Sequence, residues 1–296
     1  MIVRENFAKL LEPGLRKIWG DTYNDFETQY THIYEVHDTD KAFEVDYLIT
    51  NFGYIPEKSE GRSVDYDDIY QGWQKVYRPR LYGRGFAVTR EMLEDDQYRR
   101  IAQKPKALAR SCYQTIELLG ASVLNNGFNN SFPGGDGVAL LSNAHPLIGG
   151  GTFSNVLPTP ADLSVTSFEA MLVVISKMVD ERGLKIKVRP KKLLVTPEDE
   201  WMAQFILKSE KLPGTPNNNV NPAKGLIPYA VLNWLTDPDA WFITTDITNG
   251  FNFFWRRRPE FSNDTDFDSD IAKFKVTFRC DMGWTDPRCV VGSPGA

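Results

Sequence analysis

The sequence predicts an α+β fold in which one long helix is framed by extended strands and an α/β subdomain is inserted in the second half of the chain. Two patterns indicate this class. Apolar residues recur at helical spacing over 89–127, whereas apolar and polar residues alternate over 42–50 and again over 274–278. A helix–strand–helix order between about 167 and 208 then predicts a compact α/β unit.

Length and composition are those of a globular protein. The chain has 296 residues, of which 42% are hydrophobic and 25% charged, enough for one large domain or two modest ones. The formal net charge of −5 argues against nucleic-acid binding over the whole surface. It is compatible with a container whose contents are neutralised by small cations.

Neither a membrane span nor a disulfide framework is expected. The chain contains no run of 18 apolar residues, and its first residues lack a signal-peptide pattern. Cys112, Cys280 and Cys289 lack the spacing of metal ligands, so we expect reduced thiols in a cytosolic product.

The first residues predict an amphipathic arm. A short helix is expected over 4–12, with an interruption at Pro13-Gly14. An apolar stripe runs along the arm as far as Gly20 and includes Leu11, Leu15, Ile18 and Trp19. So much apolar surface on a terminal segment predicts docking, either on the chain's own domain or on a neighbouring copy, and the sequence leaves both open.

A long antiparallel hairpin is predicted next, with its loop at about 50–85. Its first strand places Phe43, Val45, Tyr47 and Ile49 on one face, and a second extended run covers 73–88. The tip carries mixed charges, Lys58 and Arg62 among them, and the flanks are aromatic: Tyr54, Tyr66, Tyr70, Trp73, Tyr77 and Tyr82. Because a two-stranded ribbon is marginal alone in water, we expect it to lie on its own body or on a neighbour.

Residues 89–127 predict a single helix about 50 Å long at about 1.5 Å per residue. Thr89 can cap it, Pro105 should kink it, and Asn125 to Gly127 are stop signals. The expected buried face consists of Ile101, Leu108, Cys112, Thr115, Leu119 and Val123. Length alone favours an ordinary core helix.

The insert is predicted over 160–265. It should contain a helix from about Ser167 to Arg182, a buried strand at 191–195 and a helix over 198–208 with Pro197 in its first turn. Further strands are expected around 230–235, 240–245 and 250–255. After the insert, a strand is expected at 274–278, and 284–291 leads to the C-terminal tail.

Few residues predict catalysis. His145 lies near Ser142, but a nucleophile–base pair needs an orienting third group, so we favour a hydrogen-bonded loop histidine before Pro146. The glycine clusters at 134–137 and 149–151 lack the pattern of a phosphate-binding loop, and we expect no cofactor.

Two charged clusters leave alternatives open. The acidic run Asp264–Asp270 could bring carboxylates onto a calcium ion, yet Ser269 and Lys275 depart from the pattern of a calcium loop, which favours a solvated acidic loop. The tight basic cluster of Arg256, Arg257 and Arg258 could meet phosphates, an acidic patch of a neighbour, or solvent alone.

The order of arm, hairpin, long helix, insert and return strand resembles the Hong Kong 97-type capsid fold. The local sequence is also similar to the major head subunit family of Mu-like tailed phages. This resemblance spans nearly the whole chain and rests on short matches in the right order: Leu118–Phe128, Gly137–Pro146, Lys192–Pro197, Asn221-Pro222, Asp237–Trp241, Asp281–Arg288 and Gly292-Ser293.

The resemblance implies a major capsid protein and not an enzyme. Such a protein assembles with itself into the hexamers and pentamers of an icosahedral shell that encloses packaged double-stranded DNA without sequence specificity. Its place would be the virion, and the host cytoplasm during assembly. The resemblance also implies a portal and, as an open alternative, a decoration protein. We see no extended scaffolding segment before the arm, so either scaffolding is a separate protein, which we expect as a partner, or such a segment is absent from this chain.

The family's domains are carried over to the predicted elements. They are an N-terminal arm at 1–35, a peripheral domain at 36–159 and 266–296, and an axial domain at 160–265. The candidate inter-subunit contacts are Leu11, Leu15, Ile18, Trp19, Lys58, Arg62, Tyr66, Tyr70, Trp73, Arg256, Arg257 and Arg258. Two other functions stay open, namely another virion part such as a tail tube or portal, and a metal-dependent enzyme that uses Asp264–Asp270.

Overall fold

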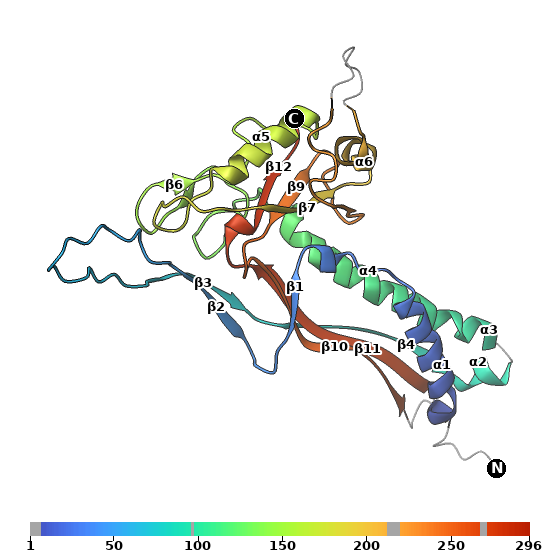
Figure 1. The fold of residues 1–296 in the computed structure, drawn as a ribbon. Coiled ribbons are helices and arrows are strands. Elements are labelled where there is room, and N and C mark those ends of the chain that lie inside the picture. Colours follow the sequence, from blue (N-terminus) through green and yellow to red (C-terminus); the bar gives the residue numbers. More distant parts are fainter. Residues whose placement is uncertain (1–6, 96–97, 212–219, 267–270) are drawn as a thin grey trace.

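The computed structural model describes residues 7–95, 98–211, 220–266 and 271–296. The side chains of 7–11, 93–94, 98–99 and 265–266 lie outside this description. Figure 1 shows a long frame built on α4, β10 and β11, an insert with α5 and α6 at one end of it, and a loop between β2 and β3 that projects sideways.

The frame is a four-stranded sheet in the order β1-β10-β11-β4. Its strands are β1 (Glu35–Asp38), β10 (Phe251–Asp266), β11 (Ile271–Trp284) and β4 (Arg80–Thr89). β1 runs parallel to β10 and the other pairs are antiparallel. The alternation expected over 274–278 is confirmed, because Phe274, Val276 and Phe278 are buried in one core. That core lies between the sheet and the helices α1 and α4.

The predicted 39-residue helix is three helices, so the single long helix was wrong. The helices are α2 (Arg90–Glu94), α3 (Tyr98–Ile101) and α4 (Gln103–Asn125). Thr89 ends strand β4, and its Oγ1 accepts the Met92 amide at 3.4 Å, so it caps the short helix α2 and not a long one. Pro105 lies in the first turn of α4, where the helix needs no N–H from it, and therefore causes no kink there. The 23 residues of α4 span about 35 Å at about 1.5 Å each.

The buried face of α4 was predicted in part. Leu108 and Cys112 are buried as expected, and Ile116 and Leu124 complete the face in place of Thr115 and Val123. An ideal helix drifts relative to a strict seven-residue repeat, which explains the one-residue shift along its length.

The arm helix α1 (Phe7–Asn24) is continuous, so the interruption expected at Pro13-Gly14 is also wrong. Pro13 is exposed, whereas Leu15 and Trp19 belong to the frame core, with Leu15 0% exposed. Trp19 packs against Tyr23 at a ring distance of 5.2 Å and against Phe261 at 5.9 Å. This packing outweighs the single helix hydrogen bond that a proline removes.

The hairpin consists of β2 (Glu44–Ile49) and β3 (Gln71–Tyr77), and its unpaired loop covers residues 50–70. The second extended run is thus shorter than expected. Pro79 separates β3 from β4, which belongs to the frame sheet. Asp46, which alternates with the apolar residues of this strand, points toward the body and accepts hydrogen bonds from Asn249, Asn252 and Thr285.

The insert is a second four-stranded sheet in the order β12-β9-β7-β8, with helices α5 and α6. Its elements are α5 (Val165–Ser176), β7 (Pro190–Val195), α6 (Glu200–Lys208), β8 (Tyr229–Val231), β9 (Trp241–Thr245) and β12 (Val290–Ser293). Ser164 and Ser167 form a capping box at the start of α5. The predicted helix–strand–helix order is confirmed, although α5 ends at Ser176 instead of Arg182.

The strand pairing corrects the expected boundary of the insert at 265. β10 hydrogen-bonds to β1 and β11 and therefore belongs to the frame, whereas β12, near the end of the chain, pairs with β9 in the insert. Pairing is non-local and cannot be read from the order of strands along a chain. The remaining domain boundaries stay predictions.

A few short elements complete the description. They are the 3₁₀ helices Tyr30–His32 and Pro287–Cys289 and the strands β5 (His145–Pro146) and β6 (Thr152–Phe153). Cys112, Cys280 and Cys289 are buried free thiols. Among the described residues, no helix is long and apolar enough to cross a bilayer.

Candidate assembly surfaces

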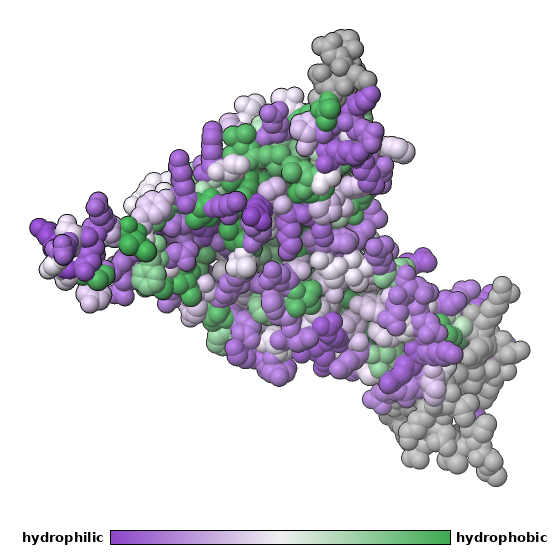
Figure 2. All heavy atoms as spheres, viewed as in Figure 1, coloured by the Kyte–Doolittle hydropathy of each residue, from purple (hydrophilic) through white to green (hydrophobic). Residues whose placement is uncertain are grey.

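The projecting loop carries apolar side chains that the chain itself leaves uncovered. Ile55 is 96% exposed and Tyr66 92% exposed. We call the exposed apolar residues of the hairpin and its loop the loop strip: Phe43, Tyr47, Ile49, Phe52, Tyr54, Ile55, Val64, Tyr66, Ile69, Tyr70 and Trp73. Figure 2 shows apolar atoms interspersed with polar ones on this projection. The expected common face of Phe43, Tyr47 and Ile49 exists, but it faces solvent in the single subunit.

The loop is closed at its root. The amide of Thr50 donates to the Tyr70 carbonyl at 3.0 Å, and the amide of Tyr70 donates to Thr50 Oγ1 at 2.8 Å. Along 51–69, all of which the structure describes, the two arms form no strand ladder. Lys58 and Arg62 lie exposed near the tip, as expected.

The arm residues lie elsewhere than expected for an assembly surface. Leu15 and Trp19 are buried in their own subunit, so of the two alternatives left open for the arm they follow the intramolecular one. Ile18 is half-buried, and the side chain of Leu11 lies outside the described residues. The apolar stripe of the arm is therefore largely used inside the subunit.

Each arginine of the basic cluster meets a carboxylate of its own chain. Arg256 lies 3.2 Å from Asp40, Arg258 lies 3.0 Å from Asp38, and Arg257 lies 3.7 Å from Glu260. These pairs are at the surface, where each contributes about 0–1 kcal/mol.

Helix α6 presents an apolar face that the sequence analysis did not single out. Trp201 is 79% exposed, and Met202 and Phe205 beside it are also exposed, whereas Ala203, Ile206 and Leu207 face the insert core. We call Trp201, Met202 and Phe205 the α6 face. The sequence contained a signal for this face, because a helix with apolar residues on both sides is typically covered on both sides.

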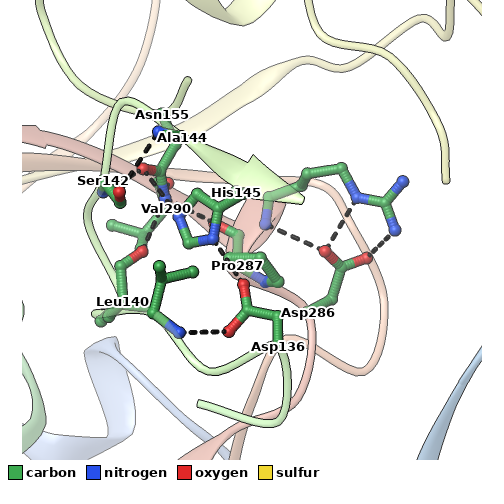
Figure 3. A network of polar contacts seen from close by, with 11 residues as sticks. Asp136, Leu140, Ser142, Ala144, His145, Asn155, Asp286, Pro287 and Val290 are labelled. Carbon is green, nitrogen blue, oxygen red and sulfur yellow. Dashed lines mark hydrogen bonds and ion pairs between the residues drawn. The ribbon is translucent and has the colours of Figure 1, made fainter. Parts of the chain in front are cut away.

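His145 belongs to a buried polar network and not to a catalytic pair (Figure 3). Its Nδ1 lies 2.6 Å from Asp136 Oδ2 and its Nε2 lies 3.2 Å from Asn155 Oδ1, so neither ring nitrogen faces Ser142. The Ser142 hydroxyl oxygen accepts the Ala144 amide at 3.2 Å instead. The hydrogen-bonded loop histidine favoured from the sequence is confirmed.

A second buried ionic group adjoins this network. Arg288 donates to Asp286 and to Glu181, and all three side chains are 6% exposed. Burial raises the pKa of Asp286 to about 7 and lowers the pKa of Arg288 to about 10. Because the pKa of Arg288 is still well above neutral pH, the arginine stays charged there. The group joins residues 181 and 286–288 and thereby fixes the junction of insert and frame.

The acidic run shows no calcium site among its described residues. Asn263 and Asp264 lie in strand β10, opposite Phe274 and Lys273 of β11. Asp268 and Asp270 lie outside the described residues. Within the part of the chain that the structure describes, no three His, Cys, Asp or Glu side chains are arranged to hold a metal ion.

A family model described as phage capsid protein matches residues 74–293, which is more than half of the chain. The chain belongs to the phage capsid protein family. The narrower likeness to Mu-like head subunits stays a prediction. No curated protein matches the chain in sequence.

Solved capsid structures share the fold of this capsid protein. The procapsid protein of bacteriophage JBD30 is 15% identical, with a TM-score of 0.52 over 96% of this chain and 74% of that one. A virus-like particle from Pyrococcus furiosus gives 12% identity and a TM-score of 0.53 over 94% and 97%. The capsid of Ralstonia phage GP4 gives 13% and 0.54 over 89% and 86%. The predicted α+β fold of the Hong Kong 97 type is thereby confirmed.

The matched span of the capsid family does not include the loop strip. It begins at residue 74, whereas the strip ends at Trp73, and the arm precedes both. The α6 face and the arginine cluster lie inside the matched span. The family thus defines what kind of protein this is, while the roles of arm and loop residues rest on their geometry.

Proposed function

We propose that this capsid protein assembles with copies of itself into hexamers and pentamers of an icosahedral shell around packaged double-stranded DNA. Its role is structural and involves no catalysis. The observation that carries the proposal is the loop strip. A loop that holds Ile55 and Tyr66 almost fully exposed leaves apolar surface that is stable only under a partner, and aromatic residues are enriched at such interfaces.

A second copy is the partner that fits a closed shell. Identical subunits can each extend a loop onto the next, and a head-to-tail contact of this kind closes into rings. We assign Tyr66, Tyr70 and Trp73 to this contact, with Lys58 and Arg62 at its polar rim. The α6 face supplies a second contact, between the inserts of neighbouring copies.

The contents and other partners follow from charge and from family. The net charge of −5, together with arginines already paired to carboxylates, supports packaged DNA held without sequence-specific contacts and neutralised by small cations. The JBD30 capsid is decorated with minor capsid protein trimers. We extend decoration to this protein, with a separate scaffolding protein and a portal as partners during assembly in the host cytoplasm.

Light scattering after size-exclusion chromatography, combined with negative-stain micrographs, tests the proposal. The wild-type protein should form capsomers or closed particles, and replacing both Ile55 and Tyr66 by serine should reduce assembly while leaving the melting temperature unchanged. Val173→Ser, on the exposed side of α5 and 46% exposed, is the matched control.

Three outcomes would contradict the proposal. They are a wild-type chain that stays monomeric at high concentration in every salt condition, assembly that is insensitive to the loop variant, and open tubes or single rings in the micrographs. The last would favour a tail tube or a portal-like part.

A further inference from the structure

One arginine of the insert binds the returning arm of the projecting loop, through a carboxylate that also holds the outgoing arm. Arg182 donates from Nη1 and Nη2 to the two carboxylate oxygens of Asp67, and from Nη2 to the Asp68 carbonyl at 2.6 Å. Its guanidinium also lies over the Tyr70 ring, 5.3 Å from the ring centre. The same Asp67 carboxylate accepts the amide of Gly53 at 2.7 Å. The outgoing and returning arms are therefore joined through Asp67, whose carboxylate a side chain from another part of the fold holds in place.

The turn that carries Arg182 is itself firmly held. Asp180 Oδ1 accepts the amides of Arg182 at 2.9 Å and Leu184 at 2.7 Å, and Gly183 closes the turn at a φ of 80°. Glu181, between them, is buried and paired to Arg288. We call the contacts of Arg182 with Asp67 and Asp68 the clamp. Through Glu181, the clamp is anchored in the ionic junction of insert and frame.

The clamp fixes the orientation of the loop as well as pairing two opposite charges. A guanidinium that binds a carboxylate through two parallel bonds fixes the angle between the two groups, which a lysine ammonium cannot do. The Arg182 fork, together with the Gly53 amide, holds the pKa of Asp67 well below its ordinary value, so the clamp persists in mildly acidic solution. A Cβ added at Gly53 would lie 3.3 Å from both Arg182 Nη1 and Asp67 Oδ2, so a larger residue there would press on this pair.

We propose that Arg182 is a positioning residue that sets the direction of the loop relative to the insert before any neighbour is bound. A loop held in one direction loses less conformational entropy when it docks, so fewer contacts are needed per subunit. The consequence for assembly rests on the function proposed above. The direction of the loop in a free subunit is independent of that function.

The test measures the direction of the loop in full-length, unassembled subunits. Spin labels at Ser59→Cys on the loop and Lys187→Cys on the insert report one distance by pulsed electron paramagnetic resonance, and the three native cysteines are buried. Wild-type protein should give a narrow distribution and Arg182→Gln a broad one. Arg182→Lys should be intermediate, because it restores charge without the fork. Arg189→Gln, exposed in the same insert, is the matched control.

A variant on the loop side keeps the test decisive if Arg182→Gln folds poorly. Asp67→Asn lies on the exposed loop and should broaden the distribution as Arg182→Gln does. Hydrogen exchange at the Gly53 amide should be about tenfold faster or more in both variants, since the amide loses its charged acceptor or that acceptor loses its anchor.

Distributions of equal width in wild type, Arg182→Gln and Asp67→Asn would overturn the proposal. Failure of the wild-type chain to assemble would overturn the proposed function but leave this measurement valid. If shells form, Arg182→Gln should raise the concentration needed for assembly several-fold, whereas Arg189→Gln should not.

Discussion

Replacing Asn155 by alanine should disconnect the insert from the frame. The Asn155 side chain is fully buried, and its Nδ2 donates to the carbonyls of Leu140 at 2.7 Å, Pro287 at 3.0 Å and Val290 at 3.2 Å. One amide group therefore holds the loop after α4 and the segment that leads into β12. Figure 3 shows how these residues converge.

The expected loss of stability follows from the buried polar groups that the substitution leaves without hydrogen-bond partners. In the alanine variant, at least the buried Leu140 carbonyl and His145 Nε2 lose a hydrogen bond, and each buried unsatisfied group costs about 1–3 kcal/mol. We expect a loss of about 4 kcal/mol in the free energy of unfolding. With a urea m-value of about 3 kcal/mol/M, the midpoint of unfolding should fall by about 1 M.

Urea unfolding of unassembled subunits, followed by circular dichroism, is the assay. Asn233→Ala is the control, because the Asn233 side chain is exposed and should change the midpoint by less than about 0.2 M. Equal midpoints for Asn155→Ala and Asn233→Ala would refute the reasoning that this network holds the two parts together.

Three further predictions concern the core, pH and the α6 face. Leu15→Ala should cost about 2–5 kcal/mol of subunit stability in a thermal melt, because Leu15 is fully buried, and an unchanged melt would show that the arm is detached. The raised pKa values of Asp286, about 7, and Asp199, about 6, mean that the folded state holds protons more tightly than the unfolded chain. Subunit stability should therefore fall as pH rises from about 4 to 7, and Asp286→Asn should reduce this slope, which denaturation at several pH values would detect. Trp201→Ser should leave the subunit melt unchanged but weaken assembly in light scattering, and unchanged assembly would rule out the α6 face as a contact.

Local patterns predicted several elements well. The alternation over 274–278 identified the inward face of β11, and the sequence around 191–208 identified β7 and α6. These elements obey their own periodicity because one face of each is buried against the same subunit. The alternation over 43–49 was equally clear, yet Phe43 and Ile49 are exposed. A pattern shows that a face is apolar but not which chain covers it.

The failures have specific physical causes. Thr89 suits both a helix cap and a strand, and it serves as both, because it pairs with Ile271 of β11 and accepts the Met92 amide of α2. The cap was thus a correct signal for the start of a helix, but α2 has only 5 residues. The length of β10 was missed because Pro259 and the arginines before it interrupt the apolar alternation, and the ladder shifts register there. The Arg182–Asp67 clamp joins residues far apart in sequence, so local reasoning had no signal for it.

Hydrogen exchange along residues 54–66 most directly tests the claim that the loop contacts a neighbouring copy. These residues lie beyond the clamp and include Tyr54, Ile55, Val64 and Tyr66 of the loop strip. The amides should exchange quickly in free subunits, where the arms form no ladder, and should become strongly protected in assembled particles, where a neighbouring copy covers them. Equal protection in free subunits and in particles would contradict the account that this loop joins one capsid subunit to the next.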